Sequence, residues 1–105
     1  MKLRKIVRAA AEDDIRDIAD YIARDNSGAA RLFDKELREK IEYLSEFPRT
    51  GHLLGRFEEE LLAARISNRF KRYLVIYFLE GNEALHIIRV LHGARDIAAE
   101  LSEIE

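Results

Sequence analysis

The sequence contains no cysteine, only one proline and no long hydrophobic run, and each absence excludes a class of protein. Without cysteine there is no disulfide framework and no thiolate metal site, and a reducing compartment fits. No apolar run approaches the roughly 20 residues that a membrane-spanning helix needs. The basic residues 1–5 are not followed by the apolar segment of a signal peptide. The three histidines lack metal-ligand spacing, so we expect no metal and no cofactor.

What is present indicates a folded protein. A hydrophobic fraction of 48% with a single proline in 105 residues is typical of a globular chain rather than a disordered one. The length suffices for one domain with a modest core and is too short for two. We therefore expect a single domain over residues 1–105 that acts in the cytoplasm.

The net charge of −2 conceals an uneven distribution of cations. Residues 1–60 carry 12 Lys and Arg against 14 Asp and Glu, whereas residues 61–95 carry six Lys and Arg against two acids. Proteins that bind along a nucleic-acid backbone usually have a larger excess of positive charge. We therefore expect no sequence-specific DNA binding by this chain alone. The local excess suits one acidic protein partner or a short RNA segment.

Two helices are predicted in the first half of the chain. Residues 11–24 and residues 29–46 each place apolar side chains at helical spacing. These side chains are Ile15, Ile18, Ala19 and Ile22 in the first helix, and Ala30, Phe33, Leu37, Ile41 and Leu44 in the second. A short break separates the helices, and Asn26 or Ser27 can cap the second one.

Strands are predicted on both sides of the helices. Residues 2–8 form a short β-branched strand, while Pro48 and Gly51 end the second helix and begin a loop. Three further strands and a short helix from about Arg95 complete the order β-α-α-β-β-β with a C-terminal helix. Two amphipathic helices joined by a tight turn must bury their stripes on the sheet. We therefore expect an α+β fold in which a helical hairpin packs on a small antiparallel sheet.

The last two strands form the most informative segment of the sequence. Residues 73–78 and the run that ends at Gly93 are joined by the turn residues 80–83, which is the pattern of a β-hairpin. Arg89, His92 and Arg95 gather at the end of its second strand. A rigid platform with cations at one end suits an anionic or acidic partner better than a small apolar ligand.

Several short segments follow one another in a recognisable order along nearly the whole chain. They are residues 17–26 (DIADYIARDN), 29–30 (AA), 41–44 (IEYL), 47–51 (FPRTG), Arg65, 73–77 (YLVIY) and 88–96 (IRVLHGARD). No single segment is diagnostic. As a collinear set they resemble the RelE/ParE superfamily of toxins from bacterial type II toxin–antitoxin pairs, and most closely its ParE branch, the plasmid-stabilisation proteins.

The resemblance implies a fold and a partner. The fold is a helical hairpin on a small antiparallel sheet, in agreement with the predicted elements. The partner is a cognate antitoxin, ParD-like or of another type, whose disordered tail folds onto the toxin. Such a tail would enter an apolar groove between the hairpin and the sheet edge and add a strand to the open edge. An acidic antitoxin segment would neutralise Arg65, Arg69 and Arg72.

The resemblance also implies two possible targets. ParE-like toxins inhibit DNA gyrase by binding, whereas RelE-like toxins cut messenger RNA on the ribosome. RelE-like nucleases commonly end in a tyrosine or a histidine–tyrosine pair, whereas the tail after Arg95 is acidic. They also place a cluster of lysines near the loop after the second helix, where this sequence has glutamate at residues 58–60. We therefore expect a gyrase inhibitor without catalytic residues. The alternatives are an endoribonuclease that uses Arg65, His92 and Arg95, and a non-toxic binding module or co-repressor.

The residues expected to contact the target or the antitoxin are basic or histidine: Arg65, Arg69, Lys71, Arg72, Arg89, His92 and Arg95. Structural roles are open for three of them. Arg95 could cap the final helix together with Asp96, although we favour a functional role for it. Arg89 is equally compatible with an ion pair to a helix, and His92 with a structural hydrogen bond at the strand end. Asp13, Asp14 and Asp17 resemble paired catalytic carboxylates, but we expect them on the solvated face of the first helix.

Overall fold

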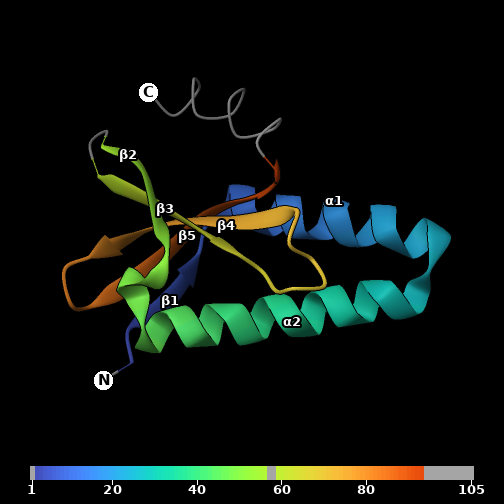
Figure 1. The fold of residues 1–105 in the computed structure, drawn as a ribbon, viewed down its shortest axis with the longest axis horizontal. Helices are drawn as coiled ribbons and strands as arrows, with labels where there is room; N and C mark the ends of the chain where they lie inside the picture. Colours follow the sequence, from blue (N-terminus) through green and yellow to red (C-terminus); the bar gives the residue numbers. More distant parts are fainter. Residues whose placement is uncertain (1, 57–58, 94–105) are drawn as a thin grey trace.

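The computed structural model describes residues 2–56 and 59–93 (Figure 1). The elements follow the order β1 (Arg4–Val7), α1 (Ala9–Asp25), α2 (Ser27–Glu46), a 3-10 turn (Pro48–Thr50), β2 (His52–Arg56), β3 (Glu60–Arg65), β4 (Tyr73–Glu80) and β5 (Ala84–His92). The predicted α+β class and order are confirmed, with one additional strand, because β2 occupies a segment predicted as a loop. The predicted helix from about Arg95 lies outside the described residues.

The described strands form one five-stranded sheet in the order β1-β5-β4-β3-β2. Strands β2 to β5 pair antiparallel, but β1 pairs with β5 in parallel, with Arg4 opposite Ala84 and Val7 opposite Ile87. The sheet is therefore mixed, and the expectation that it is wholly antiparallel is wrong at this edge. Parallel neighbours need a long connection, which the helices and the three intervening strands supply.

Tyr77 is a fully buried residue of β4 that binds the turn following α2. Its hydroxyl donates to the Pro48 carbonyl oxygen at 2.8 Å and accepts from the Gly51 N–H at 3.1 Å. A Cβ on Gly51 would stand 2.3 Å from that hydroxyl, so this position requires glycine. Burial raises the pKa of Tyr77, which keeps the phenol protonated and able to donate at neutral pH.

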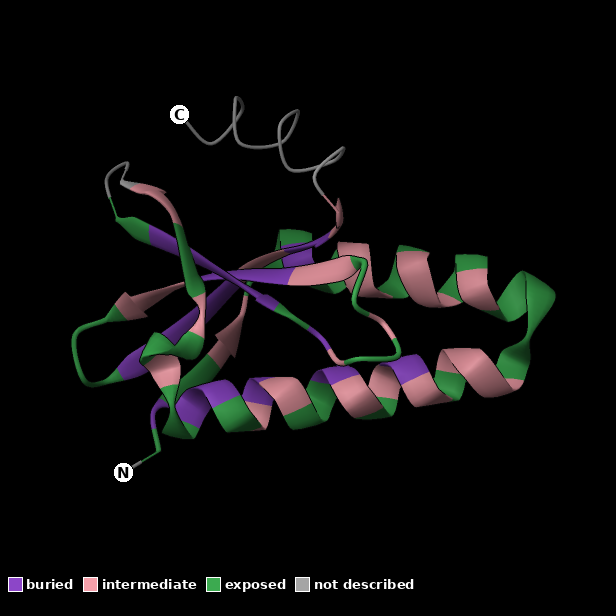
Figure 2. Ribbon diagram, viewed as in Figure 1, coloured by how far each residue is buried: buried purple, intermediate pink, exposed green. Residues whose placement is uncertain are grey.

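The helices pack side by side on one face of the sheet and bury their stripes unequally (Figure 2). The Asn26 side chain accepts from the Ala29 N–H at 3.0 Å and caps α2, as predicted. The apolar stripe of α2 is buried: Phe33, Leu37, Ile41 and Leu44. The stripe of α1 is only partly buried: Ile15, Ile18 and Ile22. The sheet contributes Leu62, Val75, Tyr77 and Ile87 to this core.

One carboxylate attaches α1 to the edge of β5 beyond the end of β1. Asp14 accepts from the Val90 N–H at 2.9 Å and from two nitrogens of the Arg89 guanidinium at 2.8 and 2.9 Å. A helix carboxylate thus satisfies an edge amide that no strand pairs in the described structure. The expectation that Asp14 lies on the solvated face is wrong, because its side chain is 14% exposed. Asp13 and Asp17 are exposed as expected.

Candidate partner-binding surfaces

Four of the predicted binding residues lie together where β3 turns into β4. We call this surface the basic turn, and it consists of Arg65, Arg69, Lys71 and Arg72. All four side chains are exposed, and the sequence holds no acid between Arg65 and Glu80. The basic turn therefore collects most of the local charge excess on one exposed segment. Such a surface attracts an acidic partner and accelerates its association.

The basic turn is held against α2 by contacts that leave most of its cations available. Phe70 packs edge-on against Phe33, with ring centroids 5.4 Å apart. Arg69 Nε donates to Glu36 Oε2 at 3.2 Å. A hydrogen bond from Ser67, reinforced by Arg69, holds the pKa of Glu36 below its usual range. Within the described residues, the other three cations of the basic turn form no ion pair.

The remaining predicted binding residues lie on β5 or beyond it. The guanidinium of Arg89 binds Asp14, so the ion pair to a helix that the sequence left open is present. The His92 ring stands edge-on to Tyr73, with centroids 5.1 Å apart. Arg95 lies outside the described residues. Neither contact tests binding, so the binding roles of these residues stay predictions.

A β-bulge in β5 changes which of its side chains face the helices. Ile87 and Arg89 pair with consecutive residues of β4, so Ile88 is an extra residue on this strand. Side chains alternate between the two faces of a regular strand. Here Ile87 and Val90, three residues apart, both belong to the core beneath the helices. The bulge therefore reverses the alternation for the last residues of β5.

As a result Arg65 and His92 lie on opposite faces of the sheet. His92 follows Val90 by two residues and packs on Tyr73, which contacts the core under the helices. Arg65 comes directly after Ala64, which also faces that core, so Arg65 belongs to the other face. Without the bulge, His92 would share the face of Arg65. The strand register does not bring these two residues of the nuclease hypothesis into one site.

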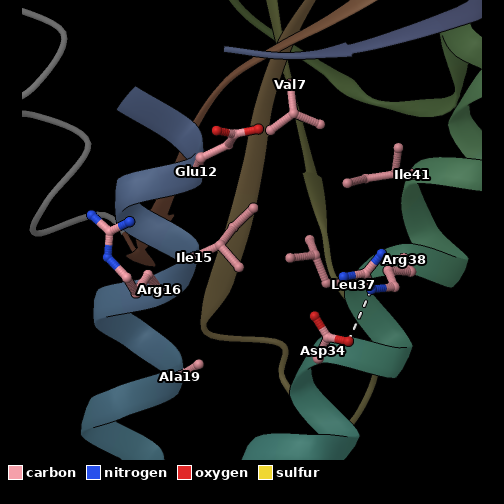
Figure 3. Close-up of a pocket in the computed structure, with 9 residues that line it drawn as sticks. All are labelled: Val7, Glu12, Ile15, Arg16, Ala19, Asp34, Leu37, Arg38 and Ile41. Atoms are coloured by element: carbon pink, nitrogen blue, oxygen red, sulfur yellow. Dashed lines mark hydrogen bonds and ion pairs between the residues drawn. The ribbon is translucent and has the colours of Figure 1, made fainter. Parts of the chain in front are cut away.

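A groove of about 390 Å³ lies between α1 and α2 (Figure 3). Its lining residues are Val7, Glu12, Ile15, Arg16, Ala19, Asp34, Leu37, Arg38 and Ile41. Ile15 from α1 and Leu37 and Ile41 from α2 point toward one another across it. Arg38 and Asp34 form an ion pair at 2.9 Å on its rim. An apolar floor with a charged rim fits one face of an amphipathic segment.

The position of this groove differs from the one that the family resemblance implies. The resemblance implies a groove between the hairpin and the sheet edge, whereas this groove runs between the two helices. From the sequence we expected the isoleucines of α1 to be buried against the sheet. Helical spacing shows which side chains share a face, but it does not show how far apart two helices pack. The charged residues at the rim do not reveal the groove in the sequence, since they follow the ordinary pattern of a solvated helix face.

The opposite edge of the sheet offers a second surface. Within the described residues β2 pairs only with β3, which leaves its outer edge open. Leu53 on β2 is 45% exposed, and Tyr43 and Phe47 at the end of α2 are 46% and 51% exposed. The two rings lie 5.0 Å apart. An open edge strand beside exposed apolar side chains is suited to the addition of a strand from a partner.

His86, one of the three histidines without metal-ligand spacing, is buried and contacts two charged side chains. Its Nδ1 lies 3.2 Å from Arg8 Nε and 3.1 Å from Arg8 Nη2, and its Nε2 lies 2.7 Å from Glu80 Oε1. A guanidinium can only donate, so Nδ1 accepts a hydrogen bond from Arg8. Nε2 therefore carries the ring proton and donates a hydrogen bond to Glu80. This bond holds the pKa of Glu80 below its usual range. The cluster joins the start of α1 to the β4–β5 hairpin through a buried histidine and two exposed charged side chains.

The described residues also bear on metal binding and on membrane insertion. No group of three or more His, Cys, Asp or Glu side chains in this part of the chain could hold a metal ion. Neither described helix carries an apolar stretch of the length and purity needed to cross a bilayer.

Comparison with known proteins identifies one family. The family described as "ParE toxin of type II toxin-antitoxin system, parDE" matches residues 6–97. The match spans both helices, the whole β2–β5 region and the basic turn. No curated protein matches the chain.

Proposed function

Since the chain belongs to the family of ParE toxins of type II toxin–antitoxin systems, we propose that it inhibits DNA gyrase by binding and thereby stops replication. In this proposal the protein acts in the cytoplasm and a cognate antitoxin neutralises it. The toxin contributes binding surfaces and no covalent chemistry. The separation of Arg65 from His92 on opposite sheet faces is the observation that most supports binding over RNA cleavage.

RNA cleavage needs several groups around one phosphate. A base must take the 2′-hydroxyl proton, an acid must protonate the leaving oxygen, and cations must stabilise the pentavalent phosphate. Arg65 and His92 face away from each other across the sheet, and Arg89 is bound to Asp14. This arrangement supports a toxin that recognises a protein surface.

The basic turn is the surface that we propose for the target. It presents Arg65, Lys71 and Arg72 on a segment fixed to α2 by Phe70 and by Arg69. A fixed cationic segment loses little conformational entropy on binding, and its charges steer an acidic surface into contact. The proposed contact is an acidic surface of gyrase.

The groove between α1 and α2 is the surface that we propose for the antitoxin. Its apolar floor would receive the apolar face of an antitoxin segment that is disordered alone and folds on binding. A following extended segment could pair with the open edge of β2 beside Leu53. Acidic residues of the antitoxin would neutralise the basic turn and block the proposed target surface.

Induced expression of the toxin alone, with parallel pulse labelling of DNA and protein synthesis, tests the proposal. We expect DNA synthesis to fall first, with filamentation, and purified toxin to inhibit gyrase supercoiling. The double variant Lys71→Glu/Arg72→Glu should lose this inhibition. Arg31→Glu, an exposed cation of α2, should retain it and serves as the matched control.

Two other outcomes would contradict the proposal. Early loss of translation with cleaved messenger RNA would indicate a ribosome-dependent nuclease. Normal growth with normal synthesis of DNA and protein would indicate a non-toxic binding module or co-repressor. Equal amounts of folded toxin in each strain, measured by immunoblot and thermal melting, make the comparison valid.

A further inference from the structure

A second cavity, separate from the interhelical groove, lies where α1 passes the ends of β4 and β5. We call it the Tyr21 pocket. It measures about 310 Å³ and is lined by Asp17, Ile18, Tyr21, Tyr73 and His92. None of its lining residues lines the groove in Figure 3. The two cavities therefore use different sides of the same helix.

Three aromatic rings line the Tyr21 pocket, and its two tyrosines differ in how far they are packed. Tyr73 is held edge-on against Phe33, at 5.5 Å between ring centroids, and against His92. Tyr21 is 67% exposed, the most exposed of the large apolar side chains in the described structure. The pocket therefore combines a packed tyrosine with an exposed one. The face of a tyrosine ring is negative and attracts a cation.

Asp17 adds a formal negative charge to the same pocket. It stands one helical turn before Tyr21, so both side chains lie on one face of α1. Asp13 is paired with Arg16 and Asp14 with Arg89. By contrast, Asp17 is exposed and forms no ion pair within the described residues.

The charge of α1 as a whole points the same way. The helix carries six acids and two arginines, a formal charge of −4: Glu12, Asp13, Asp14, Asp17, Asp20 and Asp25 against Arg16 and Arg24. A pocket with aromatic walls and an available carboxylate on an acidic helix is complementary to a positive group. An apolar side chain would bury part of the walls but would leave the carboxylate without a partner.

We propose that the Tyr21 pocket binds the guanidinium group of an arginine side chain from the antitoxin. The planar guanidinium would stack between the tyrosines and donate to the Asp17 carboxylate. Arginine fits better than lysine because it can stack and donate at the same time. The identity of the partner rests on the proposed function, whereas the preference for a guanidinium rests on the pocket alone.

The proposal also specifies the neighbourhood of that arginine in the antitoxin. Arg72 of the basic turn directly precedes Tyr73 in the chain. A segment that places an arginine in the Tyr21 pocket therefore passes close to the basic turn, where an acidic residue is favourable. We expect an arginine and an acid near each other in the antitoxin segment that binds here.

The pocket can be tested on the full-length toxin without the antitoxin. The probe is N-acetyl-arginine methylamide, and its neutral isostere N-acetyl-citrulline methylamide is the control ligand. In an NMR titration, we expect the arginine probe to shift the ring signals of Tyr21 and Tyr73 and the citrulline probe to shift them much less. Asp17→Asn should weaken the binding of the arginine probe about two- to fivefold, the effect of losing one exposed ion pair.

Asp20→Asn is the matched control, since it removes the same charge from the same helix outside the pocket. It should leave probe binding unchanged. Equal binding of both probes, an unchanged affinity in Asp17→Asn, or no shift of either tyrosine would each overturn the arginine pocket. Failure of the antitoxin to co-purify would instead overturn the proposed neutralisation, and the two failures are therefore distinguishable.

Discussion

Helices α1 and α2 have similar lengths, 17 and 20 residues, and both carry an apolar stripe, yet the fold buries them to different extents. Five residues of α2 are buried, whereas Ala11 alone is buried on α1. The half-buried residues of α1 line two cavities on its two sides, the interhelical groove and the Tyr21 pocket. α2 therefore supplies more of the buried core, whereas α1 keeps the incompletely covered surface that we propose for partners.

The means of attachment differ as well. α2 is held mainly by apolar contacts, with Phe33 fully buried between Phe70 and Tyr73. α1 contacts the same core through partly buried isoleucines, and Asp14 adds hydrogen bonds from Arg89 and Val90 of the sheet. A polar attachment fixes the position and direction of a helix without covering its sides. This arrangement keeps α1 in place while its cavities remain open.

The largest expected effect comes from truncating the core of α2. Phe33→Ala should lower the free energy of unfolding by about 3–5 kcal/mol, because it removes a fully buried ring and leaves a cavity. Ile18→Ala on α1 should cost only about 1–2 kcal/mol, since that side chain is half-buried. Urea unfolding followed by circular dichroism measures both. Equal losses would contradict the division of roles between the helices.

A smaller effect is expected from removing the attachment of α1. Asp14→Ala leaves the Val90 N–H and the Arg89 guanidinium, 21% exposed, without their carboxylate. We expect a loss of about 2–3 kcal/mol, because the variant removes the acceptor of the Val90 N–H and one charged partner of Arg89. Asp13→Ala, which breaks an exposed pair with Arg16, should change stability little. Hydrogen exchange at Val90 should rise in the first variant and not in the second.

The smallest effect concerns the exposed charges that link α2 to the start of the chain. Lys2 and Lys5 hold the pKa of Glu42 at about 2, below its ordinary 4.5. A carboxylate with a depressed pKa stabilises the fold above pH 4.5, and this contribution disappears as the pH falls toward 2. Glu42→Gln should therefore be slightly less stable than the wild type at neutral pH.

The pH profile distinguishes this effect from a general loss of packing. The gap in urea midpoint between wild type and Glu42→Gln should close as the pH is lowered through the window from 4.5 to 2. A gap that stays constant over this window would show that Glu42 acts through packing. The exposure of all three side chains keeps the expected difference small.

The local features of the fold could be predicted from the sequence because they depend on neighbouring residues. Helical spacing located both helices, Asn26 was identified as a possible cap, and the turn at 80–83 marked the hairpin. The parallel pairing of β1 and the hydrogen bonds of Asp14 could not be predicted, since they join residues about 75 to 80 positions apart.

The candidate site was only partly predictable for a similar reason. The basic turn followed from the local count of charges. The sheet faces on which Arg65 and His92 lie could not be predicted in the same way, because one extra residue at Ile88 reverses the alternation of side chains along β5. The Tyr21 pocket combines residues from α1, β4 and β5, and no single stretch of sequence contains its pattern.

The parallel pairing of β1 with β5 has a consequence for folding during translation. β1 leaves the ribosome first, but the residues that it pairs with, 84–87, are made after almost every other described element. The sheet therefore cannot be completed while most of the chain is being translated, and a contact of such long range forms slowly afterwards. Under the proposed neutralisation, an antitoxin already present in the cell would have this interval in which to bind the nascent chain before its sheet is complete.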